Sequence, residues 1–138
     1  MSWPRATARL LLGAFLVGAG VAHLVVPDEF LAQVPPSLPV RGTVVVLSGL
    51  VEIALGTAVL LVPVRHRPVA GLAVAALFVV VFPGNVSQYL TGTDAFGLDT
   101  DGARAVRLLF QPLLVVWALW ACSSGPLLRR LLRRAPRR

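Results

Sequence analysis

Residues 43–62 (TVVVLSGLVEIALGTAVLLV) constrain the fold of this chain most, because they form one long apolar run that carries a carboxylate, Glu52, near its middle. A helix of about 20 apolar residues, rising about 1.5 Å per residue, is long enough to cross the hydrocarbon core of a bilayer. A carboxylate at that depth costs roughly 2.5–3.5 kcal/mol on insertion scales, so it rarely faces lipid. Glu52 therefore needs a polar partner, or a wet cavity, that other helices supply.

The composition is that of an integral membrane protein. Of the 138 residues, 57% are hydrophobic and only 14% are charged, well below the charged share of a soluble domain. The net charge of +7 comes from arginines that lie between and after the apolar runs. We therefore attribute this charge to membrane topology and expect no nucleic acid partner. The single cysteine, Cys122, leaves no intramolecular disulfide and no CxxC redox pair.

The chain is predicted to be a single domain, an all-α, polytopic membrane four-helix bundle. Apolar runs separated by polar or proline-rich segments predict helices at about 9–26, 43–62, 69–90 and 104–122, followed by a basic tail at 123–138, all within one domain spanning 1–138. A basic lead before an apolar run is also typical of a cleaved signal peptide. The run is long for such a peptide, so we expect an uncleaved first helix. Ala14, Gly18 and Ala22 recur at every fourth position and predict a close helix contact on that face.

Pro83-Gly84 lies within the third predicted span and is followed by Asn85. Proline removes a backbone N–H and frees a carbonyl one turn back, which must find a partner inside a membrane. Two alternatives follow: a helix break beside a polar cavity, or a kinked helix that only packs well. In the loop that follows, Asp99 and Asp101 lack the remaining ligands of a calcium loop, so we expect no metal site.

The charges predict the topology. With four spans, one side of the membrane receives only basic residues, namely Arg5, Arg9, Arg65, Arg67 and the six arginines of the tail. The other side receives two arginines and all the loop acids, Asp28, Glu29, Asp94, Asp99 and Asp101. By the positive-inside rule both termini are cytoplasmic, in a multi-pass protein of the plasma membrane. The tail repeat LLRRLLRR would form a short amphipathic helix on anionic lipid, or serve only as a topology anchor.

This topology brings polar residues from all four helices to one level in the outer half of the bundle. Polar groups within lipid must pair, so we predict mutual contact inside the bundle. The predicted pocket consists of His23, Ser48, Glu52, Asn85, Gln88, Arg107 and Gln111.

Several motifs resemble the DoxX family and its DoxX-like relatives, in the same order along nearly the whole chain. They are GxGxxH with a following proline (Gly18 to Pro27), EF (Glu29, Phe30), VPPSLP (Val34 to Pro39), SGLVEIALG (Ser48 to Gly56), VFPGN (Val81 to Asn85) and RLLFQPLL (Arg107 to Leu114). VFPGN has glycine where the family usually has alanine. The resemblance implies a four-helix membrane bundle with cytoplasmic termini. It also implies, for some members, a membrane subunit of quinone-linked oxidoreductases.

Three functions remain open. In the first, the protein is a redox-associated membrane subunit that binds a quinone in the polar pocket, with oxidoreductase subunits as partners. In the second, the polar residues only fix helix packing in a structural or interaction protein, with further copies of the chain as candidate partners. The third is small-molecule transport, which would favour internal symmetry that this chain lacks. His66 lies on the opposite side from His23, so a bis-histidine haem within one chain is excluded, and we do not expect an enzyme that acts alone.

Overall fold

The structure, a computed structural model, describes residues 2–135, and within them helices are the main secondary structure and no strand occurs. Four helices are long and apolar enough to cross a membrane: α1 (Trp3–Val25), α3 (Arg41–Leu61), α4 (Arg67–Thr91) and α5 (Asp101–Ala121). The shorter elements are α2 (Pro27–Leu31), the 3-10 turn η1 (Val64–His66) and α6 (Gly125–Arg134). The predicted helical class and the four apolar spans are therefore confirmed.

Two boundaries differ from the sequence prediction. α1 begins at Trp3 and not near residue 9, because Pro4 stands in the first turn, where a missing N–H costs nothing. In the tail, for which a short amphipathic helix was one of two alternatives, the helix α6 forms over Gly125–Arg134. Its last residues, 136–138, lie outside the described part of the chain.

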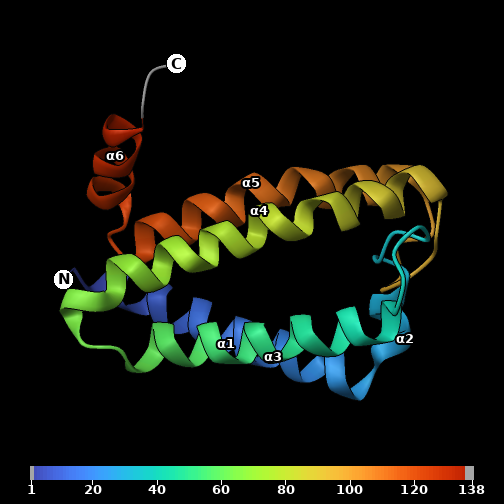
Figure 1. The fold of residues 1–138 in the computed structure, drawn as a ribbon, viewed down its shortest axis with the longest axis horizontal. Helices are drawn as coiled ribbons and strands as arrows, with labels where there is room; N and C mark the ends of the chain where they lie inside the picture. The colour runs from blue at the N-terminus through green and yellow to red at the C-terminus, as the bar shows by residue number, and fades with distance from the viewer. Residues whose placement is uncertain (1, 136–138) are drawn as a thin grey trace.

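The four long helices form two layers (Figure 1). One layer contains α1 and α3, the other α4 and α5, and each helix packs mainly against its partner within the layer. The start of α1, η1 and α6 lie at one end of the bundle, which we call the terminal end. The short helix α2 and the 92–100 loop lie at the other end, which we call the loop end.

Two pairs of glycines hold α1 and α3 in backbone contact. A Cβ atom on Gly20 would lie 2.5 Å from the Gly49 carbonyl oxygen, and a Cβ on Gly56 would lie 2.8 Å from the Gly13 carbonyl oxygen. The pairs are two helical turns apart on both helices, so they lie along one seam. Lipid offers no hydrophobic drive for helix association, so such close packing is a main source of stability. The predicted stripe was wrong, because Gly18 has open space around it and Ala14 is exposed.

The helices α4 and α5 continue through their internal prolines, Pro83 and Pro112. Neither alternative for Pro83 holds in full: the helix does not break there, yet Pro83 and Gly84 border the cavity described below. A polar side chain from the neighbouring helix stabilises this region, because Gln111 Nε2 donates to the Phe78 carbonyl at 2.6 Å, in the turn before Pro83. The carbonyl that Pro83 itself frees is that of Val79, one residue further along, so this hydrogen bond joins α4 to α5 next to the proline and does not satisfy the freed group.

The apolar core fills the terminal half of the bundle. Leu12 and Leu16 of α1, Val59 of α3 and Val74 of α4 are at most 1% exposed. At the terminal end Arg9, itself buried, donates from Nη1 to the carbonyls of Val59 (2.5 Å) and Leu60 (3.1 Å) and so caps the last turn of α3. The loop half lacks this continuous apolar filling, and the polar residues gather there.

The glycine seam predicts opposite effects for two neighbouring substitutions. Gly20→Ala places a methyl group against the α3 backbone, so it should destabilise the protein by about 1–3 kcal/mol through overpacking. Gly18→Ala is the matched control: its methyl group meets nothing, and the gain in helix propensity should leave stability unchanged or raise it by about 0.5–1 kcal/mol. Thermal unfolding in mild detergent measures both. Equal midpoints for the two variants would contradict the seam.

Candidate functional site

A cavity of about 360 Å³ lies in the loop half of the bundle, between the two helix layers. Helices α1 and α3 form one wall, α4 and α5 form the other, and Phe30 of α2 with residues 33–35 and 38 of the following loop close the loop end. Six of the seven residues of the predicted pocket line it: His23, Ser48, Glu52, Asn85, Arg107 and Gln111. The structure therefore brings polar residues of four helices around one space.

Glu52 and His23 form the polar part of the α1–α3 wall. His23 Nδ1 lies 3.2 Å from Glu52 Oε2 and 2.9 Å from the Ala19 carbonyl oxygen, one turn earlier in α1. A single Nδ1–H can point at only one of these acceptors, and the Ala19 carbonyl is the better placed. Glu52 Oε2 is therefore buried without a hydrogen bond. The side chains of His23 and Glu52 are 12% and 13% exposed, so this unused acceptor is shielded from solvent.

Gly49 explains why these two side chains meet. It lies one turn before Glu52 in α3, and a Cβ there would approach the His23 Cβ to 2.7 Å. With hydrogen in that place, the base of His23 packs directly on the α3 backbone. The same glycine seam that joins the two helices therefore sets the distance between the imidazole and the carboxylate.

Amide side chains form the polar part of the α4–α5 wall. Asn85 Nδ2 donates to Gln111 Oε1 at 2.9 Å, and Gln111 Nε2 donates to the Phe78 carbonyl. Arg107 Nε donates to Asn85 Oδ1 at 3.3 Å. Asn85 and Gln111 are each only 6% exposed. This network joins α4 to α5 and fixes the position of the Arg107 side chain at the cavity wall.

Gln33, which the sequence analysis did not single out, is the seventh polar residue of the cavity wall. One orientation of its amide donates from Nε2 to Gln88 Oε1 at 3.3 Å. Turned over, its oxygen accepts from Arg107 Nε at 3.2 Å and from Nη2 at 3.0 Å. We assign the second orientation, because in the first one the Gln33 NH₂ group faces the N–H groups of Arg107, so that two donors would meet. Gly84 of α4 is the sequence feature that allows the Gln33 backbone to come so close to α4. A Cβ at residue 84 would lie 2.5 Å from the Gln33 carbonyl oxygen.

Gln88 is the one predicted pocket residue that does not line the cavity. It is only 1% exposed, and its Nε2 donates to the Thr93 carbonyl at 3.2 Å, where α4 ends. It lies behind Gln33 and holds the start of the 92–100 loop. Its role in this position is structural.

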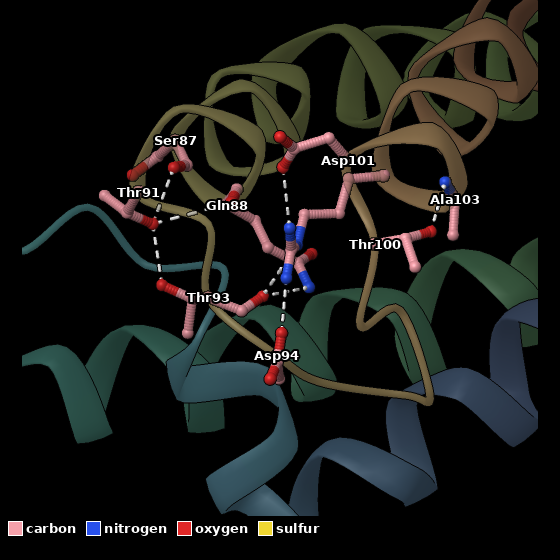
Figure 2. A network of polar contacts seen from close by, with 9 residues as sticks. Ser87, Gln88, Thr91, Thr93, Asp94, Thr100, Asp101 and Ala103 are labelled. Atoms are coloured by element: carbon pink, nitrogen blue, oxygen red, sulfur yellow. Dashed lines mark hydrogen bonds and ion pairs between the residues drawn. The ribbon is translucent and has the colours of Figure 1, made fainter.

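Arg104 organises the same loop (Figure 2). Its guanidinium pairs with Asp94 and with Asp101, the latter at 2.8 Å from Nη1, and Nε donates to the Thr93 carbonyl at 3.3 Å. Although Arg104 is a charged residue, it is only 6% exposed. The sequence analysis treated Arg104 only as a charge for topology, because nothing along the chain shows that two loop carboxylates fold back onto it.

A row of rings connects the two walls at the loop end. His23 stacks on Phe30 with ring centroids 3.6 Å apart, and Phe30 meets Phe96 edge to face at 4.8 Å. The Arg107 guanidinium lies over the Phe96 ring, 5.8 Å from its centroid. Glu29 holds Phe96 in place, because its Oε2 accepts from the Phe96 N–H at 2.7 Å. The row seals the cavity at this end and links His23 of one wall with Arg107 of the other.

The two opposite charges of the cavity do not meet. Glu52 has its ion-pair contact with His23, and Arg107 forms no ion pair with any carboxylate within residues 2–135. The cavity therefore offers the Arg107 guanidinium as a donor on one wall and Glu52 Oε2 as an acceptor on the other. No group of three or more metal-ligating side chains occurs in the described part of the chain. The arrangement suits a neutral or anionic organic molecule that accepts hydrogen bonds from Arg107.

The comparison with known families gives one match. A family described as a domain of unknown function, DUF8561, matches residues 12–122. The chain belongs to the DUF8561 family. Searches of curated proteins and of solved structures gave no significant match. The DUF8561 match covers the cavity-lining residues of all four long helices and ends at Cys122, before α6 begins.

The amide network of this DUF8561 protein predicts a stability effect. Gln111→Leu removes the partner of both Asn85 Nδ2 and the Phe78 carbonyl, so the protein should lose about 1–3 kcal/mol of stability. Thermal unfolding in detergent, compared with Leu114→Ala as a control for altered packing on the same helix, measures the loss. In a double variant that carries both Asn85→Leu and Gln111→Leu, the loss of stability should be smaller than the sum of the losses in the two single variants. Full additivity would contradict a shared network.

Proposed function

We propose that this protein is a DoxX-like membrane subunit of a quinone-linked redox complex and that its cavity holds the quinone head group. One observation carries the proposal: Glu52 and Arg107 line the same cavity of about 360 Å³, where Glu52 Oε2 is buried without a hydrogen bond and Arg107 forms no ion pair within residues 2–135. The motifs that resemble the DoxX family support it independently.

The size and the rim of the cavity favour a ligand over a packing defect. Its volume falls at the lower end of the range of small-molecule sites, which is about 300–1,000 Å³. Phe15, Leu38 and Val80 line the cavity and yet are 46%, 44% and 73% exposed on the apolar outer surface of the bundle. A cavity bordered by such residues is accessible to a molecule dissolved in the bilayer. A quinone is of this kind, with a polar ring and an apolar tail.

The residues of the two walls provide distinct chemistry for such a ring. Arg107 would donate hydrogen bonds to a quinone oxygen, and Asn85, Gln111 and Gln33 hold its guanidinium in place. Reduction of a quinone to a quinol takes two electrons and two protons. Glu52 and His23 would pass both protons to the ring, one after the other, from the other wall. An oxidoreductase partner subunit would supply the two electrons.

The charge distribution supports an orientation with both termini in the cytoplasm, in the plasma membrane. The start of α1 lies at the terminal end, together with η1 and the four arginines of α6. Apart from Glu52 in α3, the acidic residues lie at the loop end, in α2, in the 92–100 loop or at the start of α5. The positive-inside rule then directs the cavity towards the outer half of the membrane.

A structural role is the second candidate, and the closed amide network favours it. The hydrogen bonds that join Asn85, Gln111 and the Phe78 carbonyl need no ligand. Polar contacts of this kind are worth about 0.6 kcal/mol each in membranes. Under this alternative the protein would assemble with partners or with further copies of itself. The cavity would hold only lipid chains.

Mass spectrometry of small molecules extracted from the purified protein separates the two candidates. The parent should retain a quinone, and Glu52→Gln and Arg107→Gln should each lower its amount by at least about tenfold, because each removes a charged hydrogen-bonding group. Asp28→Asn and Arg65→Gln are the matched controls, since they remove the same charges outside the cavity. Bulk phospholipid alone in all samples, with reduced thermal stability of the two cavity variants, would refute the quinone site and favour the structural role.

A further inference from the structure

The helix α6 is strongly amphipathic and lies outside the cavity described above. Its sequence, GPLLRRLLRR, alternates pairs of leucines and arginines and contains no acidic residue. At 3.6 residues per turn, this repeat places leucines on one side and arginines on the other. Leu127 and Leu128 are half-buried, whereas Leu131 and Leu132 remain 48% and 65% exposed, so the bundle leaves the second half of the leucine side uncovered.

A fixed joint sets the direction of α6. Ser123 has a left-handed backbone (φ 59°), and its N–H donates to the Trp120 carbonyl at 3.2 Å. The Ser124 N–H donates to the Leu119 carbonyl at 2.8 Å, which completes a Schellman motif at the end of α5. Ser124 is fully buried, and Gly71 of α4 lies directly against it. α6 is therefore attached to the bundle by an ordered turn.

The joint turns α6 sideways at the terminal end, so that it projects away from the bundle beyond the α4–α5 layer (Figure 1). The four long helices run along the long axis of the molecule, and α6 stands across that axis. In a membrane the long axis follows the bilayer normal, so α6 extends along the bilayer surface. Aromatic residues gather at the same end, where Trp120 is 45% exposed and the Arg5 guanidinium lies 5.6 Å from its ring centroid. Tryptophan is typical of the level of the head groups.

We propose that α6 binds anionic phospholipid head groups of the leaflet at the terminal end. Its leucines would enter the boundary of the acyl chains, and Arg129, Arg130, Arg133 and Arg134 would pair with the phosphates. We choose anionic lipid as the partner because of its charge. The arginines of α6, a helix without acidic residues, match the negative head groups, and the exposed leucines beside them match the apolar layer beneath. This inference does not rest on the quinone site, which lies in the other half of the bundle.

A fluorescence experiment on the full chain in vesicles tests the proposal. Cys122, the only cysteine, is fully buried, and burial raises the pKa of its thiol, while the nearby Arg9 and Arg67 lower it. In a Cys122→Ala background, an environment-sensitive dye is attached at Leu131→Cys or, on the other side of α6, at Arg133→Cys. The vesicles contain phosphatidylcholine alone or with phosphatidylglycerol, and a spin-labelled lipid quenches any dye that enters the acyl region.

The dye at Leu131→Cys should be quenched in the anionic vesicles, and the dye at Arg133→Cys should not. Each arginine near an anionic surface changes binding by about fivefold, so Arg129→Gln should lower the ratio of quenched to unquenched dye by about that factor. Arg65→Gln removes an arginine at the same end outside α6 and should leave the ratio unchanged. Equal quenching at Leu131→Cys with and without phosphatidylglycerol would overturn the proposal. Absence of quenching in both vesicles would also overturn it and would indicate a protein partner for α6.

Discussion

The backbone contact between α1 and α3 is the constraint on which the rest of this structure depends. Within a bilayer, helices gain stability from close packing rather than from the removal of apolar surface from water. The pairs Gly13 with Gly56 and Gly20 with Gly49 provide that packing along one seam. Gly49 also allows His23 to lie beside Glu52, since a Cβ at Gly49 would approach the His23 Cβ to 2.7 Å. The seam thus determines both the stability of one helix layer and the geometry of the carboxylate.

The cavity follows from the contrast between the two halves of the bundle. Near the chain ends, buried leucine, valine and alanine side chains bring the two helix layers together. Towards α2 the layers carry polar side chains whose contacts lie within each wall. Asn85 and Gln111 join α4 to α5, while His23 and Glu52 lie side by side on α1 and α3. Within residues 2–135 Arg107 and Glu52 form no ion pair across the space between the walls, and Glu52 Oε2 keeps an unused acceptor that a ligand can use.

The sequence was enough to predict the four apolar spans and the gathering of polar residues from these helices at one depth. It was not enough to predict the contacts of the loops. Apolar runs of membrane length have few alternatives to a spanning helix, and buried polar residues in such helices must find one another. Gln33 and Arg104 owe their places to the path of loops, which no periodicity encodes. The face of α1 that packs against α3 was also predicted wrongly. Ala14 and Gly18 form one row of small side chains on α1, and Gly13 and Gly20 form another. Only the arrangement of the partner helix decides between two such stripes.

The most direct test of this account is an experimental structure of the protein in lipid, determined without an added ligand. The account predicts an open space between the two walls, with an extra molecule whose polar end lies next to Arg107 and within reach of Glu52. It also predicts that the guanidinium and the carboxylate do not touch. A direct ion pair between Arg107 and Glu52, with the two helix layers closed on each other, would contradict the account and leave the polar residues as a packing network.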